Sequence, residues 1–406
     1  MKNAETLLRE NAETLLRENR AWAEEVFLKI DKKYNAVTLR SRDKLPYGVD
    51  ENGIHIDTIQ RNRRPWWTNG FWGGLNWILY AYTKNEEYKT TAKRSEELLR
   101  PVADEYGRLD HDVGFVWHLT FGADYRLTGD AAAKNVDLYM AASLASRFVL
   151  ATDVPGGFIR AWNGKRGTDW DNYDRTIIDC MMNLPLLYWA SETVDDDRFA
   201  RIAKAHADVS LRDHLRPDGS VNHIVDHDRA TGALTGTLGG QGYGVGSSWS
   251  RGCSWAVYGF ALSYRHTGEK RYLEGAKRAA DYFIDCVKDD WLPRVDFRAP
   301  KEPVLYDSTA GACAACGLIE LSKILPENEG GKYLEAALNL LRAMGEKFCN
   351  FDPANDHLLD YGTERYPAEI SPEGYKKAGV HMSIIYGDYF FVEAILKLLG
   401  AEFDPW

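Results

Sequence analysis

Five segments of the chain are predicted to form amphipathic helices, and each follows a segment that is apolar on nearly all sides. The amphipathic segments place apolar residues at i, i+3, i+4 and i+7, with charged residues opposite; they are residues 85–99, 129–148, 196–211, 268–287 and 330–349. The apolar segments are residues 69–82, 112–127, 176–192, 248–265 and 308–325, and a sixth, 383–399, follows the last amphipathic segment. Helices that are apolar on all faces are buried, so the chain alternates outer helices with inner ones.

An N-terminal helix at about residues 4–30 brings the outer helices to six, matching the six inner ones. This alternation predicts an all-α fold, the closed toroid called an (α/α)6 barrel. The sequence does not alternate strands with helices, which disfavours a parallel α/β sheet. No Pro-rich or Ser-rich linker divides the chain, so we expect a single domain over residues 1–406. The tandem copy of NAETLLRE within residues 3–18 merely lengthens the first helix.

The charge balance restricts the partners of the protein. Fifty Lys and Arg residues oppose sixty Asp and Glu residues, a net charge of −10. A chain of this charge does not suit nucleic acid or an anionic membrane surface. The sequence has no apolar run long enough for a membrane span and no apolar signal segment at its start, and its six cysteines are scattered. We therefore expect a cytoplasmic protein.

Three motifs invite a metal or phosphate interpretation, and none supports it well. The glycine-rich stretch 235–252 lacks the spacing of a phosphate-binding loop, and we interpret it as a flexible loop. His223 and His227 are spaced like ligands, but their surroundings indicate a turn without further ligands. Cys313 and Cys316 form one CxxC within a small-residue helix, which favours buried thiols that act as small apolar groups. We expect no metal.

Two aspartates are the strongest catalytic candidates. Asp179 lies among apolar residues in a predicted helix, where an ionised acid is rarely buried without a partner. Arg175, four residues earlier, could form an ordinary ion pair with it. Asp112 could instead be a helix N-cap. If both acids face the same cavity, burial and like charge raise one pKa, and the apolar neighbours of Asp179 favour that residue as the proton carrier.

Aromatic and polar residues near the predicted helix ends suggest a carbohydrate site. Tryptophans offer flat apolar faces on which sugars stack, and those closest to the helix ends are Trp67, Trp72, Trp162, Trp249 and Trp255. Arg251 suits a carboxylate ligand, and Gln241 lies in the glycine-rich loop.

Five strings together resemble the unsaturated glucuronyl hydrolases of glycoside hydrolase family 88. They are WTNGFWGG (67–74), LDHDVGF (109–115), IIDCMMNLPLL (177–187), WSRGCSWAVYGFAL (249–262) and YGDYFFVEA (386–394). The resemblance runs from about residue 60 to the C-terminus. It implies an (α/α)6 fold, no metal or organic cofactor, and as substrates short oligosaccharides with an unsaturated uronate at the non-reducing end.

The resemblance also implies the reaction and the residues that perform it. The family hydrates the C4=C5 double bond left by polysaccharide lyases; the resulting hemiketal opens and the aglycone leaves. The catalytic acid/base falls on Asp179, which protonates C4 and then takes a proton from water, while Asp112 holds ring hydroxyls and tunes it. The implied substrate contacts are Trp67, His111, Trp162, His223, Gln241, Trp249, Arg251 and Trp255.

The sequence departs from the family pattern at Gly240, where a histidine often precedes the glutamine. Residues 374–383 do not clearly match the serine/lysine pattern of members that favour sulfated substrates, so the parent polysaccharide stays open. Two alternatives remain. An unsaturated rhamnogalacturonyl hydrolase shares the chemistry but typically lacks the second aspartate of LDHDVGF. A sugar epimerase or an acidic-sugar-binding protein could share the fold, and His111 and His223 could then serve as an epimerase's bases.

Overall fold

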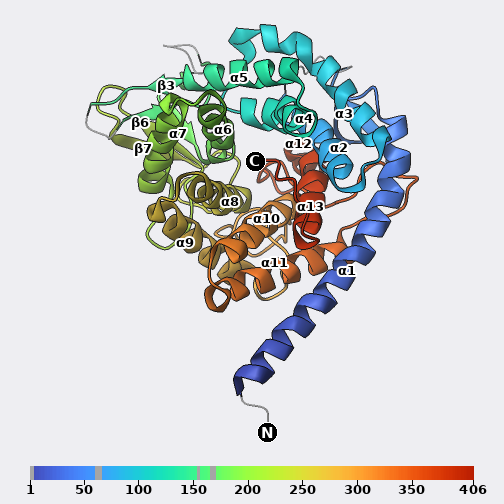
Figure 1. The fold of residues 1–406 in the computed structure, drawn as a ribbon. Helices are drawn as coiled ribbons and strands as arrows, with labels where there is room; N and C mark the ends of the chain where they lie inside the picture. Colours follow the sequence, from blue (N-terminus) through green and yellow to red (C-terminus); the bar gives the residue numbers. More distant parts are fainter. Residues whose placement is uncertain (1–3, 60–65, 153–155, 165–170) are drawn as a thin grey trace.

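The computed structural model describes residues 4–59, 66–152, 156–164 and 171–406, with side chains from residue 19 onward. Within these residues the helices form two concentric rings (Figure 1). The inner ring contains α2 (Asn69–Thr83), the π-helix Gly114–Gly122 with α4 (Ala123–Thr128), α6 (Leu184–Val194), α8 (Ser250–Thr267), α10 (Ser308–Ile324) and α13 (Ile385–Leu398). The outer ring contains α1 (Ala4–Arg40), α3 (Glu86–Leu99), α5 (Ala131–Ala145), α7 (Arg198–Val209), α9 (Lys270–Val287) and α11 (Glu327–Lys347).

The inner ring is closed, because α13 packs against both α10 and α2. The predicted all-α (α/α)6 barrel is therefore confirmed. Inner helices approach one another closely at glycines: a Cβ at Gly70 of α2 would lie 2.1 Å from the carbonyl oxygen of Phe115 in the next inner helix. Gly317 of α10 meets the backbone of Tyr258 in α8 in the same way. Glycine in these apolar segments thus permits close packing of the inner ring.

Helices of both rings begin and end at residues that favour helix termini. Asn85 and Asp130 precede α3 and α5, and their side chains accept hydrogen bonds from backbone N–H groups of the first turn. Gly129 and Gly268 adopt the left-handed conformation where α4 and α8 end. The first turns of α1, which carry the duplicated sequence, extend away from the rest of the molecule (Figure 1). No helix in the described part of the chain combines the length and the hydrophobicity needed to cross a membrane.

In the described residues, three small antiparallel sheets occupy the loops, and a short helix, α12 (Pro372–Ala378), precedes the last inner helix. The first sheet pairs β1 (Pro46–Val49) with β2 (His55–Asp57), and the second pairs β3 (Phe148–Val149) with β4 (Phe158–Ile159). The third has the order β5 (Arg175–Ile177), β6 (Ile224–His227) and β7 (Leu234–Leu238).

The third sheet corrects two sequence-based predictions. Asp179 does not lie within an α-helix, because residues 175–177 form β5 and Ile178–Met182 form a short 3-10 turn. Helix α6 begins only at Leu184, with Pro185 in its first turn, the position where proline's missing N–H costs least. The segment after His223 is a strand, β6, and not a turn.

Candidate active site

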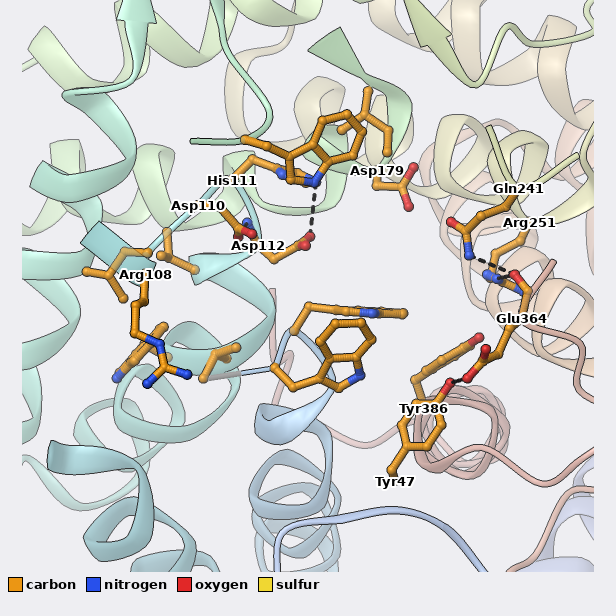
Figure 2. A pocket seen from close by; sticks show the side chains of 18 of the residues that line it. Tyr47, Arg108, Asp110, His111, Asp112, Asp179, Gln241, Arg251, Glu364 and Tyr386 are labelled. Atoms are coloured by element: carbon orange, nitrogen blue, oxygen red, sulfur yellow. Dashed lines mark hydrogen bonds and ion pairs between the residues drawn. The ribbon is translucent and has the colours of Figure 1, made fainter. Parts of the chain in front are cut away.

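A cavity of about 650 Å³ opens at the N-terminal ends of the inner helices. Figure 2 shows both candidate aspartates and their neighbours around it. The lining residues are Tyr47, Trp66, Trp67, Arg108, Leu109, Asp110, His111, Asp112, Val113, Val116, Trp117, Trp162, Ile177, Asp179, Gln241, Arg251, Glu364, Arg365 and Tyr386. The cavity therefore brings together two candidate catalytic acids and five of the eight predicted substrate contacts: Trp67, His111, Trp162, Gln241 and Arg251.

The pairing of β5 with β6 places Asp179 beside His223. Ile177 lies opposite Ile224 in this register, and the N–H of Ile178 donates to the carbonyl oxygen of His223 at 3.1 Å. As a result His223 Nε2 lies 3.4 Å from Asp179 Oδ1. Both atoms are buried, and neither makes a hydrogen bond with another group in the described part of the chain.

The pKa of Asp179 is lowered, which contradicts the prediction that its apolar neighbours raise it. Burial alone would raise this pKa, but the contact with His223 and the charges of His111 and Arg251 outweigh it. Arg175 has no part in this balance, because its Nε donates to Asp226 Oδ1 at 2.7 Å across the β5–β6 pair. The expected Arg175–Asp179 ion pair is therefore wrong, since strand geometry turns the two side chains toward different neighbours.

Asp112 has the opposite electrostatic environment. Burial, the carboxylate of Asp110 and that of Asp179 raise its pKa well above the usual value. Its backbone N–H donates to Asp110 Oδ1 at 3.0 Å, and its Oδ1 lies 3.2 Å from His111 Nε2 (Figure 2). Asp112 precedes the π-helix Gly114–Gly122, but its side chain makes no cap hydrogen bond there. The cavity thus contains one carboxyl group that favours the neutral form and one that favours the ionised form.

Arg251 is buried and already held by the protein. Its Nη1 pairs with Asp307 and donates to the carbonyl oxygen of Thr363 at 2.8 Å, and its Nη2 donates to that of Glu364 at 2.7 Å. Its guanidinium carbon lies 4.3 Å above the Trp249 ring. Most of its N–H donors are engaged, so Arg251 provides a positive charge that is fixed in place near Asp179. It also forms part of the cavity lining.

The predicted aromatic contacts divide into two groups. Trp67 and Trp162 line the cavity and are partly exposed. Trp249 and Trp255 are buried and absent from the lining: Trp249 packs on His223 with ring centroids 4.1 Å apart, and Trp255 packs on Phe115 in the core. Trp72 is also a core residue, so these three tryptophans do not line the cavity.

His223 is the third predicted contact that lies outside the lining, and the glycine-rich loop explains its position. The backbone N–H of Gln241 donates to His223 Nδ1 at 3.0 Å, and the Gln241 side chain donates to the carbonyl oxygen of Glu364 at 2.7 Å. Gly240 has a φ of +59°, and a Cβ there would lie 2.1 Å from His223 Nδ1. This is the position at which the sequence departs from the family pattern. The glycine found there lets the loop approach His223 closely.

Several lining residues were not identified from the sequence. Tyr47 from β1, Glu364 from the loop after α11 and Tyr386 from α13 form one wall, with the Tyr47 hydroxyl hydrogen-bonded to Glu364 (Figure 2). Arg108 and Arg365 line the cavity with exposed side chains. Tyr47, Arg108, Glu364 and Arg365 come from segments distant in sequence, and no local pattern marks them. Two other lining residues lie in strings already noted, Asp110 in LDHDVGF and Tyr386 in YGDYFFVEA.

The predicted absence of a metal can be tested against the geometry. In the described residues, ligand atoms of Asp110, His111 and Asp112 lie within 4.8 Å of one another. These side chains already contact each other or the backbone, and three ligands are fewer than a structural zinc site requires. His223 precedes β6 and His227 is its last residue, so a rise of about 3.3 Å per residue separates them too far to share an ion. Cys313 and Cys316 are buried thiols in α10.

Comparison with known proteins identifies the family. No protein-family model matches the chain. An unsaturated glucuronyl hydrolase of Bacillus sp. (strain GL1) is 36% identical over 370 residues, which are 90% of this chain and 93% of that protein. A solved structure of an aspartate-to-asparagine variant of UGL with dGlcA-Glc-Rha-Glc has a TM-score of 0.82 at 32% identity, covering 92% of this chain and 97% of that one.

A second solved structure is an unsaturated glucuronyl hydrolase variant from Streptococcus agalactiae complexed with dGlcA-GalNAc6S. It has a TM-score of 0.78 at 26% identity and covers 95% of this chain and 94% of that one. The sequence identity to the Bacillus protein extends across nearly the whole of both chains, and the helical ring agrees in the solved structures. The chain belongs to the unsaturated glucuronyl hydrolase family.

Proposed function

We propose that this protein removes the unsaturated glucuronyl residue from the non-reducing end of lyase-generated oligosaccharides by hydrating its C4=C5 double bond. The single observation that carries the proposal is the pair of cavity carboxyls, Asp112 and Asp179, whose pKa values are shifted in opposite directions. Hydration of a vinyl ether needs a proton for C4 and a base for the water that adds at C5. A site with one neutral and one ionised carboxyl can supply both.

The balance of the reaction requires no cofactor. C4 gains a proton, C5 gains the hydroxyl of water, and the second proton of that water passes to a carboxylate. The product is a hemiketal, which opens to a ketone and releases the aglycone. We propose Asp179 and Asp112 as the catalytic residues, and a single catalytic domain formed by the helical ring.

The other residues of the cavity fit the binding of an acidic sugar. The partly exposed faces of Trp67 and Trp162 are suited to stacking against sugar rings. The N-terminal ends of the inner helices point toward the cavity, where they favour negative charge. Arg365, exposed in the lining, offers a cation for the uronate carboxylate or for an anionic group on the aglycone.

The two related complexes carry different aglycones, one with a sulfated N-acetylgalactosamine and one with a neutral trisaccharide. We therefore propose the unsaturated uronate as the recognised unit. The decisive experiment is a panel of lyase-generated disaccharides from chondroitin, hyaluronan, heparin, gellan and xanthan, followed by the loss of ultraviolet absorbance at the double bond. Loss of absorbance with release of a free aglycone is the expected result.

The same panel separates the alternatives. An unsaturated rhamnogalacturonan disaccharide should react much more slowly than a glucuronyl one. An epimerase would give a product of unchanged mass, and a binding protein would leave the absorbance intact; either result would refute the proposal. The matched inactive control is Asp179→Asn, and Asp226→Asn, which changes only the neighbouring Arg175 ion pair, should remain active.

A further inference from the structure

Arg147 is a buried arginine that does not line the cavity but joins two segments that do. It lies between α5 and β3, and only 5% of its surface is exposed. Its Nη1 donates to the carbonyl oxygen of Leu109 at 3.1 Å, and its Nη2 donates to that of Ala161 at 3.0 Å. Leu109 begins the LDHDVGF string, which contains Asp112, and Ala161 directly precedes Trp162. One side chain therefore connects the segment of Asp112 with the segment of Trp162.

Further hydrogen bonds of Arg147 strengthen the same junction. Its Nε donates to the carbonyl oxygen of Arg160 at 3.0 Å, and Nη1 also donates to Asn163 Oδ1 at 2.7 Å. Asn163 Nδ2 in turn donates to the carbonyl oxygen of Leu109 at 2.7 Å. These acceptors surround a planar fork of donors, which suits a guanidinium and does not suit the point-like ammonium of lysine.

The junction extends from Ala161 toward both candidate acids. The backbone N–H of His111 donates to the Ala161 carbonyl oxygen at 3.1 Å, and His111 Nδ1 lies 2.9 Å from the same oxygen. The N–H of Ala161 donates to the carbonyl oxygen of the first residue of β5 at 2.8 Å. His111 directly precedes Asp112, and β5 ends two residues before Asp179. The relative placement of the two acids thus depends on a peptide group that Arg147 binds.

The positive charge of Arg147 also faces the acids of the LDHDVGF string. Burial lowers the pKa of Arg147, and the carboxylate of Asp110 opposes this shift most strongly. Burial raises the pKa of Asp112, and the charge of Arg147 opposes that rise. Burial lowers the pKa of His111, and Arg147 adds to the lowering. Three more titratable groups face the guanidinium: Tyr106, Arg160 and Cys180.

We propose that Arg147 is a positioning residue for the proposed hydration: it holds the segment of Asp112 and the segment of Trp162 at a fixed separation and supplies a buried positive charge behind the acids. This role rests on the proposed function, in which a stacked sugar ring must meet the acids in one orientation. A displacement of about 1 Å can cost about 10²-fold in rate, so a rigid junction between the two segments matters for catalysis.

The first test separates the shape of the guanidinium from its charge. Arg147→Lys retains the charge but cannot reach the acceptors on both segments. With an unsaturated chondroitin disaccharide, kcat/KM should fall about 10–10²-fold, through a higher KM as well as a lower kcat. Asn163→Ala removes an exposed side chain of the same junction and keeps the charge, so it should change both constants in the same direction and to a smaller extent.

The matched control is Arg126→Lys. Arg126 lies in α4, at the C-terminal end of its inner helix, whereas the cavity opens at the N-terminal ends. Its guanidinium also binds backbone carbonyl oxygens, those of Gly122, Asp404 and Pro405. This variant should lower the melting temperature and leave kcat and KM unchanged. If Arg147→Lys behaves like the control, the proposal is overturned.

The second test is the pH dependence of kcat/KM. Arg147→Gln removes the charge, which raises the pKa of the neighbouring acids and of His111, so both limbs of the profile should move to higher pH. Arg147→Lys should keep the limbs of the unsubstituted protein. A residue that only stabilises the fold would lower the rate of the glutamine variant without moving its limbs, and that result would contradict the proposal.

A third measurement needs no substrate. Amide hydrogen exchange of the free protein should accelerate at residues 109–112 and 160–163 in Arg147→Lys, and only near the C-terminal segment in Arg126→Lys. Unchanged exchange at both cavity segments would overturn the proposal. If the unsubstituted protein consumes no unsaturated disaccharide, the proposed function is wrong, while hydrogen exchange still decides whether Arg147 joins the segments. If the disaccharide is consumed but exchange and kinetics do not respond, only the role of Arg147 fails.

Discussion

Gly240 approaches His223 so closely that a Cβ atom at Gly240 would lie 2.1 Å from His223 Nδ1. The same glycine has a φ of +59°, a conformation that is strained for other residues. This contact lets the Gln241 N–H reach His223, which in turn faces Asp179. The chemistry of Asp179 therefore depends on a residue that has no side chain.

Replacement of Gly240 by alanine should weaken catalysis through His223. The added methyl group must displace the loop or the imidazole, so the Gln241 hydrogen bond is lost and the pKa of Asp179 rises. We expect kcat/KM to fall about tenfold, equivalent to about 1.4 kcal/mol. Gly244→Ala is the matched control in the same loop, because a Cβ at Gly244 meets nothing within 4 Å. Equal rates for the two variants would contradict this role of Gly240.

Asp179→Asn should lose at least about 10²–10⁴-fold in kcat, the usual contribution of general acid–base catalysis. Affinity for an unsaturated disaccharide, measured by calorimetry, should change far less, because other residues form the binding surface. Asp226→Asn should keep near-normal activity, since Asp226 pairs with Arg175 away from the cavity lining. A near-normal kcat for the Asp179 variant would remove this residue from the mechanism.

Asp112→Asn should abolish most turnover and at the same time raise the melting temperature near neutral pH. The folded pKa of Asp112 is raised above its unfolded value, so its contribution to stability is fully present below about pH 4 and is lost as the pH rises toward the folded pKa. The amide does not titrate, so the stability advantage of the variant should grow with pH, by up to about 1.4 kcal/mol per unit of pKa shift. Thermal unfolding from acidic to neutral pH measures this; a variant less stable at neutral pH would contradict the shift.

Reaction in heavy water should place one deuterium at C4 of the keto product, because that carbon is protonated during hydration. The saturated glucuronide, which has no double bond to protonate, should not be cleaved. Mass spectrometry and proton NMR of the product test both points together. Efficient cleavage of the saturated sugar would instead favour direct glycoside hydrolysis by the two aspartates.

Treatment with a chelator should leave the rate unchanged. The ligand atoms of Asp110, His111 and Asp112 are engaged with each other or with the backbone, and hydration by carboxyl groups needs no metal. The assay is the disaccharide absorbance before and after dialysis against the chelator, with zinc added back as the control. Loss of activity that zinc restores would show that these residues bind an ion.

Local sequence was sufficient to predict the ring of helices. Buried inner helices must be apolar all round, and outer helices must keep one polar face. The pattern of apolar and polar side chains therefore indicates which helices are inner and which are outer. The LDHDVGF and IIDCMM strings also brought Asp112 and Asp179 forward as candidates, because buried acids are rare outside functional sites. The cavity confirms that the two residues lie together.

The environment of those acids depended on contacts between distant segments. Strand β5 pairs with β6 about fifty residues later, and this register brings His223 to Asp179 and turns Arg175 toward Asp226. Neither contact leaves a periodic pattern in the sequence. For this reason the predicted rise in the pKa of Asp179 was wrong: the apolar neighbours were visible in the sequence, whereas the opposing donors were not.

The sequence by itself thus determined the helical architecture and the identity of the two acids, because hydrophobic periodicity and buried charge are local properties of a chain. Only the tertiary structure decided the surroundings of each acid. Those surroundings depend on backbone groups of Ala161 and Gln241, which contact the rings of His111 and His223. Every residue carries the same N–H and C=O groups, so their direction is set by the folded path of the chain and cannot be read from the order of side chains.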